Sequence, residues 1–313
     1  MPLVPFQQLM AEAERGQYAV GYFESWNLES LLAVADAAEA VRSPVLLGFS
    51  GIYLPDPARL AREPLSVYAA MSLEVCRRLS VPACLVFNES PHLDWVLRAI
   101  KERFGLVMFT DDSMVFDALV ERVALVVKEA HRQGTAVEGE PVALAGVGGE
   151  LEAVPSDLRF TDPARASDFV ERTGIDALAV NVGQVHMHGR TRVRLDLDHL
   201  SVLQRAVAVP LVLHGASSVS REDLRAATRI GVRKINLGSV LKRTYFEALK
   251  LACLEAGTDY NPYEVVGSGL SQDVLTSARL ALQQTVEKWM QLFGSAGKAP
   301  DFNPSKEAEE QGR

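Results

Sequence analysis

The chain has 313 residues, 48% of them hydrophobic and 23% charged, which is typical of a globular protein with a large buried core. Its 40 acidic residues outnumber 32 basic ones, giving a formal charge of −8, and no dense Lys/Arg cluster appears, so the sequence argues against nucleic acid as a partner. It has no apolar stretch long enough for a membrane span, no secretion-signal pattern and three cysteines without metal-like spacing. We therefore expect a cytoplasmic protein with no membrane partner.

Short apolar runs alternate with amphipathic segments along most of the chain. There are eight such runs, at residues 18–23, 44–50, 82–88, 106–111, 135–140, 177–183, 210–216 and 234–238. The segments between them carry the 3.6-residue period of surface helices. Eight strand–helix units predict an α/β fold in which a parallel sheet closes into a TIM (β/α)8 barrel, because closure removes both sheet edges. An open doubly wound sheet is the alternative, but the first helix lacks the Gly-x-Gly-x-x-Gly of dinucleotide sites.

The chain continues beyond the eighth unit. A further helix is predicted over residues 272–292 by apolar positions that recur every four residues: Val274, Ala278, Leu282, Val286 and Met290. The residues from 294 onward are polar and rich in charge, which is typical of a flexible tail. We therefore expect one barrel domain over residues 1–293, including this C-terminal helical extension, and a flexible tail over 294–313.

Polar side chains gather where the predicted strands end, which is where such barrels place their active sites. They are Ser50, Asn88, Glu89, Asp111, Asp112, Glu138, Glu140, His186, His214, Asn236 and Ser239. Two histidines at neighbouring strand ends, His186 and His214, together with acidic neighbours, are a typical ligand set for a divalent metal. His188 is an alternative to His186. The small-residue turns 215–218 and 236–239 precede helices, so their backbone N–H groups predict a phosphate site, although tight turns use the same residues.

With these residues in place, the chain resembles the class II, metal-dependent fructose-bisphosphate and tagatose-bisphosphate aldolase family over nearly its whole length. The resemblance is carried by residues 168–179, by 210–215 running to 231–236, and by the opening residues 1–4 with 18–23 and 27–29. It implies a divalent metal, with Zn²⁺ expected and Mn²⁺ or Mg²⁺ as alternatives. It also implies a small sugar-phosphate-like substrate and a homodimer or homotetramer.

The family's functional positions fall on residues of this chain. The resemblance places metal histidines at His186 and His214, and a glutamate ligand at Glu138 or Glu140. It places the loop acid that exchanges a proton at carbon at Glu150 or Glu152. Phosphate and ketose contacts fall on Gly183, Gly215, Ser217, Asn236 and Ser239, with Arg190 near a position that is often Lys; we add Ser50 at the second strand end.

The chain departs from the family at the chemistry. Asn88 and Glu89 replace the aspartate and histidine of the His-x-Asp-His motif, and an amide cannot accept the hydroxyl proton that this aspartate takes. Glu89 is therefore a candidate metal ligand, and Glu89 or Glu24 could serve as the missing base; a carboxylate ligand favours harder ions such as Mn²⁺ or Mg²⁺. Glu24 stands where the family has Asn. Residues 261–263 read Asn-Pro-Tyr in place of Asp-Pro-Arg, which argues against a bisphosphate.

These features favour a metal-dependent carbon–carbon lyase that acts on a ketose phosphate or related polyol ketone through a metal-stabilised enediolate, rather than on a standard bisphosphate. One alternative is an inactive relative that only binds a sugar phosphate or a protein. Another is a metal-dependent isomerase or epimerase that uses the same enediolate.

Overall fold

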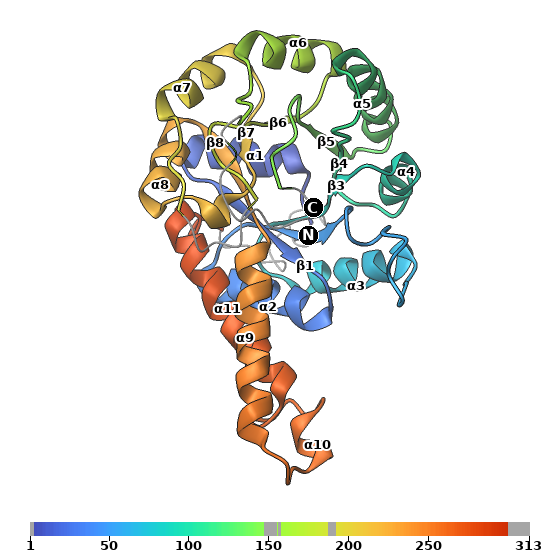
Figure 1. The fold of residues 1–313 in the computed structure, drawn as a ribbon, viewed down its shortest axis with the longest axis vertical. Helices are drawn as coiled ribbons and strands as arrows, with labels where there is room; N and C mark the ends of the chain where they lie inside the picture. The colour runs from blue at the N-terminus through green and yellow to red at the C-terminus, as the bar shows by residue number, and fades with distance from the viewer. Residues whose placement is uncertain (1–2, 147–154, 156–157, 187–191, 300–313) are drawn as a thin grey trace, which may run out of the picture.

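The computed structural model describes residues 3–146, 155, 158–186 and 192–299. Eight parallel strands pair in sequence order, and the last pairs with the first to close the barrel, with helices around it (Figure 1). The strands are β1 Val20–Ser25, β2 Val45–Ser50, β3 Ala83–Ser90, β4 Leu106–Phe109, β5 Ala136–Gly139, β6 Ala177–Ala179, β7 Leu211–Leu213 and β8 Val232–Leu237. The predicted TIM barrel is confirmed.

The helices follow the strands in regular alternation, apart from α1, which precedes β1, and α10 and α11, which follow α9. They are α1 Phe6–Gly16, α2 Leu28–Val41, α3 Leu65–Arg78, α4 Leu93–Lys101, α5 Phe116–His131, α6 Pro163–Thr173, α7 Leu197–Ala206, α8 Arg221–Ile230, α9 Ser239–Ala256, α10 Pro262–Val265 and α11 Val274–Phe293, with a short 3-10 turn at Ala216–Ser218. The last long helix matches the one predicted over residues 272–292. Its start is fixed by Asp273, whose side chain accepts hydrogen bonds from the backbone N–H groups of Leu275 and Thr276.

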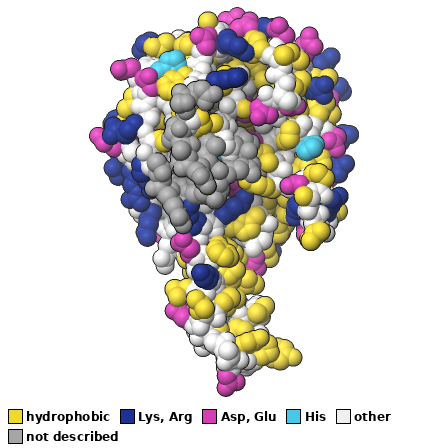
Figure 2. All heavy atoms as spheres, viewed as in Figure 1, with side chains coloured by type: hydrophobic (Ala, Val, Ile, Leu, Met, Phe, Trp, Pro, Cys, Tyr) yellow, Lys and Arg dark blue, Asp and Glu magenta, His cyan; other side chains and the backbone are white. Residues whose placement is uncertain are grey.

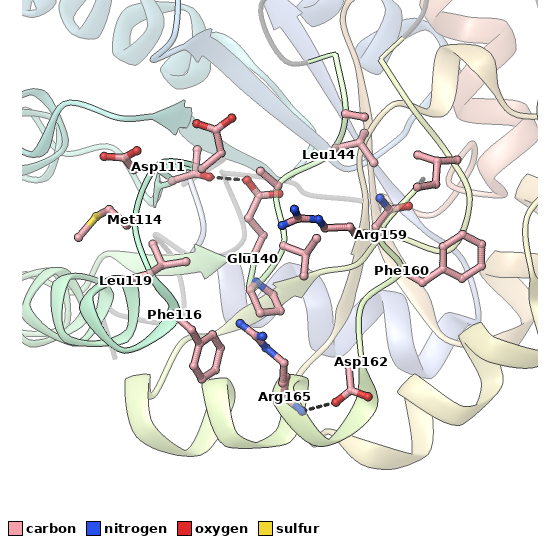
Figure 3. A pocket seen from close by; sticks show the side chains of 18 of the residues that line it. Asp111, Met114, Phe116, Leu119, Glu140, Leu144, Arg159, Phe160, Asp162 and Arg165 are labelled. Atoms are coloured by element: carbon pink, nitrogen blue, oxygen red, sulfur yellow. Dashed lines mark hydrogen bonds between the residues drawn. The ribbon is translucent and has the colours of Figure 1, made fainter. Parts of the chain in front are cut away.

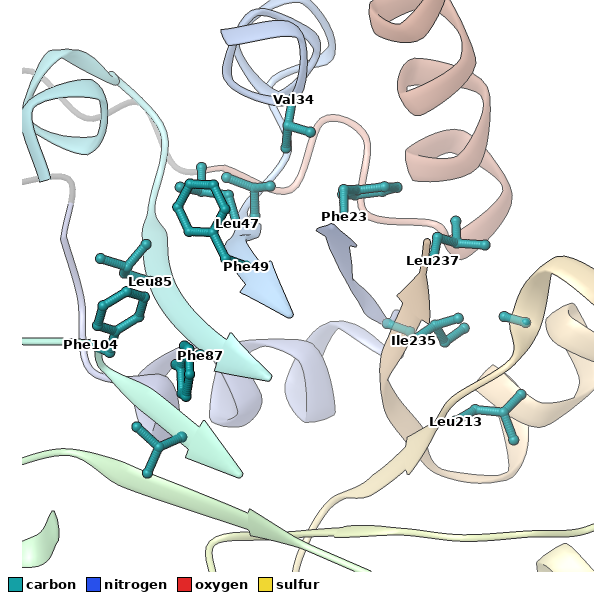
Figure 4. Packing of buried hydrophobic residues seen from close by; sticks show 14 of the residues in the cluster. Phe23, Val34, Leu47, Phe49, Leu85, Phe87, Phe104, Leu213, Ile235 and Leu237 are labelled. Carbon is teal, nitrogen blue, oxygen red and sulfur yellow. The ribbon is translucent and has the colours of Figure 1, made fainter. Parts of the chain in front are cut away.

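Side chains alternate across each strand, so the barrel has an inner and an outer core. Outward residues such as Phe49, Phe87 and Ile235 pack beneath the helices (Figure 4). A separate buried cluster contains inward residues of the strands, among them Tyr22 and Val86, together with residues of α1 such as Phe6 and Met10. Because apolar side chains fill the lower part of the barrel, its polar inward residues are concentrated toward the carboxyl ends of the strands.

The final segment of the described chain is held against the barrel rather than detached from it. The buried hydroxyl of Ser43 donates a 2.8 Å hydrogen bond to Ser295 Oγ, and the backbone N–H of Gly297 donates to the carbonyl of Val41. Residues 294–299 of the predicted flexible tail therefore make ordered contacts, because small residues here fit against the end of α2. Residues 300–313 lie outside the described residues. In the described part of the chain, none of the helices has the length and apolar character needed to cross a membrane.

Candidate active site

Three side chains that were predicted as metal ligands meet at the mouth of the barrel. His214 directly follows β7, His186 lies in the segment after β6, and Glu89 lies near the end of β3. One potential ligand atom from each side chain lies within 4.8 Å of the other two. Glu89 Oε1 is 3.1 Å from His214 Nδ1 and 3.7 Å from His186 Nε2.

An irregularity in β3 turns Glu89 into the barrel. The pairing of β3 with β4 shifts register between Phe87 and Ser90, and Glu89 has a φ of 47°, a left-handed conformation that costs energy for a residue with a side chain. In a regular strand Asn88 and Glu89 would point to opposite faces. Instead, Asn88 Nδ2 donates a 2.7 Å hydrogen bond to Glu89 Oε2 within the buried interior. The bulge thus gives the site two adjacent side chains from one strand.

The potential ligand atoms of Glu89, His186 and His214 lie in an environment suited to a cation. Within the described residues, Glu89 Oε1, His186 Nε2 and His214 Nδ1 are all buried without a hydrogen-bond partner. Unpartnered buried polar atoms are costly, and native structures normally avoid them. In a tetrahedral site with metal–ligand bonds of about 2.0–2.1 Å, ligand atoms lie about 3.3 Å apart. The observed separations bracket that value, so these residues fit a divalent metal.

His214 is oriented by groups from two other strands. Its Nε2 lies 2.6 Å from Glu138 Oε1 on β5, and Glu138 Oε2 pairs with Lys234 Nζ on β8 at 2.8 Å. Both Glu138 and Lys234 are fully buried. When Nε2 donates a hydrogen bond to Glu138, Nδ1 faces Glu89. Carboxylates commonly orient metal-ligating histidines through such a hydrogen bond to the other ring nitrogen. Glu138, left open as a ligand by the sequence, thus supports His214 instead of joining the group.

The charges in this cluster stabilise one another. Burial alone would raise the pKa of Glu89, but the neighbouring His214 and His186 hold it well below its ordinary value of 4.5. Burial alone would lower the pKa of His214, but the carboxylates of Glu89 and Glu138 raise it to about 10. Burial opposes the charge of Lys234 and lowers its pKa, while Glu138 counteracts that shift. The site therefore keeps its carboxylates ionised at neutral pH.

The side chain of Asn88 links Glu89 to Asn236 through hydrogen bonds. Its Oδ1 accepts a 3.3 Å hydrogen bond from Asn236 Nδ2, and Asn236 Oδ1 in turn accepts from Lys234 Nζ at 2.6 Å. Asn236 Nδ2 also lies 2.9 Å from His214 Nε2. Asn236 was expected among the phosphate contacts, but its side chain faces the metal group because it shares the inward face of β8 with Lys234.

Glu140 was expected among the metal ligands, but it does not belong to the group of three. Its carboxylate accepts a hydrogen bond from the hydroxyl of Thr110, which follows β4, and this contact draws it away toward a pocket beside the barrel mouth. Burial raises the pKa of Glu140 to about 7. A carboxyl group with such a pKa is suited to proton exchange at neutral pH.

The pocket that Glu140 borders has a volume of about 790 Å³ (Figure 3). It lies between the segments that follow β4, β5 and β6, and its wall includes Arg159 and Asp111. Arg165 also lines it, with its guanidinium carbon 4.3 Å from the ring centre of Phe116. A pocket of this size accommodates a small polyhydroxylated molecule beside Glu140.

The remaining described residues among the predicted contacts lie at or near the carboxyl ends of strands. Ser50 ends β2 and is buried; its hydroxyl accepts from the N–H of Ile52. Gly183 and Gly215 both have positive φ, and a Cβ on either would come within 3.0 Å of a carbonyl oxygen. Ser217 is buried in the turn after β7, and Ser239 begins α9. Glu150, Glu152, His188 and Arg190 lie outside the described residues.

Sequence reasoning missed the contribution of Lys234 and Thr110. A signal for Lys234 was present, because it stands two residues before Asn236 on the same strand and so shares its inward face. A lysine on an inward face requires an acidic partner, and Glu138 is the matching residue on β5.

Tyr263, at the position used to argue against a bisphosphate, is 88% exposed at the tip of the segment formed by α9, α10 and α11 (Figure 1).

Comparisons with known proteins agree with this architecture. A family model described as fructose-bisphosphate aldolase class-II matches residues 4–298. The YdjI aldolase of Escherichia coli K12 is 26% identical with a TM-score of 0.77, covering 95% of this chain and 100% of that one. A putative fructose-1,6-biphosphate aldolase of Coccidioides immitis is also 26% identical, with a TM-score of 0.77 over 94% of this chain and 97% of its own. A fructose-bisphosphate aldolase of Campylobacter jejuni, 18% identical, has the same fold with a TM-score of 0.75 over 95% and 97%.

Proposed function

Because the chain belongs to the class II fructose-bisphosphate aldolase family, we propose that it is a metal-dependent carbon–carbon lyase that cleaves a ketose phosphate or a related polyol ketone. The observation that carries this proposal is the group of three unpartnered ligand atoms on Glu89, His186 and His214. A retained ligand set at the mouth of an aldolase-family barrel supports catalysis over mere retention of the fold.

The donor set fits a divalent cation with one carboxylate and two imidazole ligands. Zn²⁺ is the ion that the family resemblance favours, whereas the carboxylate of Glu89 in place of an imidazole favours Mn²⁺ or Mg²⁺. A cation held there would polarise the ketone carbonyl and stabilise the enediolate that retro-aldol cleavage leaves behind.

We assign the proton-transfer steps to other residues than those of the family motif. Asn88 cannot take the hydroxyl proton, and its amide instead fixes Glu89 and Asn236. We assign the hydroxyl proton to Glu140, since it borders the pocket and its pKa is about 7. Glu89 is the alternative base. Glu150 remains the proposed group for proton exchange at carbon.

Assays of aldehyde release test the proposed cleavage. We expect protein loaded with Zn²⁺, Mn²⁺, Co²⁺ or Mg²⁺ to cleave at least one member of a panel of ketose monophosphates, ketose bisphosphates and unphosphorylated ketoses. The variant His214→Ala should lose this activity, whereas His92→Ala, which changes an exposed histidine at the start of α4, should keep it.

The same panel separates the two alternatives. Stabilisation by a ligand without any product, in every metal, would contradict cleavage and favour an inactive binding relative. Incorporation of solvent deuterium into an otherwise unchanged ketose would contradict it in favour of an isomerase or epimerase. The observation that favours an isomerase or epimerase is the loss of the hydroxyl base at Asn88.

We also propose that a second copy of the chain covers the arm formed by α9, α10 and α11, giving a homodimer or homotetramer. Large apolar side chains are exposed along the arm, among them Phe246, Leu251, Leu254 and Val266. Figure 2 shows such side chains gathered on the projecting part of the molecule. Exposed apolar patches of this kind mark interfaces. The cytoplasm remains the proposed compartment, in keeping with the free cysteines.

A further inference from the structure

Glu24 occupies the position where a barrel of this type commonly receives an anion, the start of the helix after its eighth strand. The pairing of β1 with β8 sets Phe23 opposite Leu237, so the next residue, Glu24, lies beside Gly238. Glu24 Oε2 is 2.5 Å from the place where a Cβ on Gly238 would stand. A side chain at residue 238 would therefore collide with this carboxylate, and glycine there lets it lie directly over the backbone that begins α9.

A lysine on the same helix holds the carboxylate in this position. Lys242 Nζ is 2.5 Å from Glu24 Oε1, and the side chain of Glu24 is only 15% exposed. The ammonium group of Lys242 also lies 4.1 Å from the ring centre of Tyr53. The positive charge of Lys242, on the first turns of α9, is thus already matched by a negative charge from the protein.

The adjacent turn after β7 is also engaged with the protein. The N–H of Val240, in the first turn of α9, points to Ser217 Oγ at 3.5 Å. The hydroxyl of Ser218 lies 2.9 Å from the carbonyl of Val185 and 2.8 Å from that of Gly215. The hydroxyl groups of Ser217 and Ser218 are thus both engaged with groups of the protein at this turn.

We propose that Glu24 is a specificity-determining residue that takes the place of a substrate phosphate at the start of α9. The inference rests on the proposed function and names its substrate class: a polyol ketone whose end at this turn is uncharged. The helix N-terminus attracts the Glu24 carboxylate as it would a phosphate. A phosphate dianion brought to the same place meets like charge, whereas a hydroxyl group donates a hydrogen bond to Glu24.

Binding of inorganic phosphate tests this inference without any need for the true substrate. We expect isothermal titration of the purified protein to show Glu24→Gln binding phosphate at least about tenfold more tightly than the wild type. The isosteric amide removes the negative charge and frees Lys242 for the anion. Adding Lys242→Met to this variant should abolish the gain. Glu247→Gln, an exposed change on α9, should behave as the wild type.

Equal phosphate affinity in the wild type and in Glu24→Gln, whether tight or weak, would overturn the inference. Glu24→Asn provides a second variant with the charge removed, and circular dichroism with the unfolding midpoint establishes that each variant is folded. Metal content is measured on the same samples. A loss of the proposed metal centre would appear there in all proteins alike, whereas failure of this inference appears only in the phosphate titrations.

Discussion

Glu89 occupies the position at which the family resemblance places a metal-binding histidine. Its left-handed backbone and the register shift of β3 bring a carboxylate to within 3.1 Å of His214 Nδ1. Local backbone strain of this kind persists where the surrounding structure requires it, often at functional sites. The replacement therefore keeps a potential ligand atom at this position but changes its kind.

This exchange predicts an altered metal preference. Glu89→His should raise the affinity for Zn²⁺ relative to Mn²⁺ by at least about tenfold, because imidazole suits Zn²⁺ and carboxylate suits harder ions. Competition with a chelating dye measures both affinities. Glu63→His, an exchange at an exposed carboxylate that is not part of the Glu89, His186 and His214 group, is the matched control. An unchanged ratio in Glu89→His would show that Glu89 does not ligate the ion.

The buried pair of Lys234 and Glu138 predicts a large effect on stability. Lys234→Met leaves Glu138 with His214 as its one remaining partner of the pair described above, and breaking a buried pair from one side costs about 3–5 kcal/mol of unfolding free energy. Adding Glu138→Gln to this variant removes the uncompensated charge and should recover part of the loss. Urea unfolding in the presence of a chelator measures both proteins. A cost for Lys234→Met below about 1 kcal/mol would contradict the buried pair.

The sequence placed Glu138 and Glu140 on the same inward face, since they are two residues apart on a strand, but it left their functions open. Their separation depends on partners from other strands. Glu138 meets His214 and Lys234, whereas Glu140 meets Thr110. Contacts between strands that are distant in the chain cannot be derived from the periodicity of either strand.

Among the elements, α11 depends on the side chain of Asp273 at its start. Burial alone would raise the pKa of Asp273, but hydrogen bonds from the backbone N–H groups of Gly269, Leu275 and Thr276 hold it below 3.8. A carboxyl group whose pKa is lowered by folding stabilises the fold at any pH above its pKa in the unfolded chain. This contribution is lost as the pH falls through its pKa in the folded protein.

Two substitutions test this cap. Asp273→Ala should cost about 1 kcal/mol of unfolding free energy at neutral pH. Asp273→Asn keeps a neutral cap, so the wild type should lose stability relative to it as the pH falls from about 5 to about 3. Urea unfolding across this range measures both effects. Parallel pH profiles for the wild type and Asp273→Asn would contradict the account of the cap.

The arm of α9, α10 and α11 predicts an oligomer that a single charge disrupts. Leu254 is 69% exposed on α9, so Leu254→Glu should reduce the molecular mass in solution by at least half while the fold is retained. Light scattering coupled to gel filtration measures this. Glu121→Lys, an exposed change on α5, should leave the mass unchanged. A wild type that elutes as a monomer at micromolar concentration would contradict the proposed interface.

Most elements could be predicted because their sequence period is local. All eight apolar runs contain strands, and the four-residue repeat from Val274 to Met290 lies in α11. The strands β6 and β7 are shorter than their runs. After β6, the side chain of Asn181 accepts a hydrogen bond from the N–H of Gly183, and after β7, His214 contacts Glu138. Helix α1 was missed, although Phe6, Leu9, Met10 and Ala13 follow a helical spacing, because its buried face plugs the barrel rather than covering a strand.

For the molecule as a whole, closure of the barrel explains why residues from β3, β5, β7 and β8 meet. The strands pair in order, so their carboxyl ends form a ring, and the apolar interior below leaves the polar residues at that ring. The sequence predicted the ring and the two histidines that we propose as metal ligands. It did not predict which carboxylate completes the group, because the β3 bulge that turns Glu89 inward is set by pairing with β4.

The metal content of protein purified without chelator is the most direct test of the metal centre. Elemental analysis should find about one divalent ion per chain in the wild type and in His92→Ala, and a clear loss in His214→Ala, because His214 supplies a ligand and His92 does not. Reconstitution with Zn²⁺ or Mn²⁺ should raise the unfolding midpoint only in the first two proteins. A wild type that holds no more metal than His214→Ala, both as purified and after reconstitution, would contradict the metal centre and the lyase activity proposed from it.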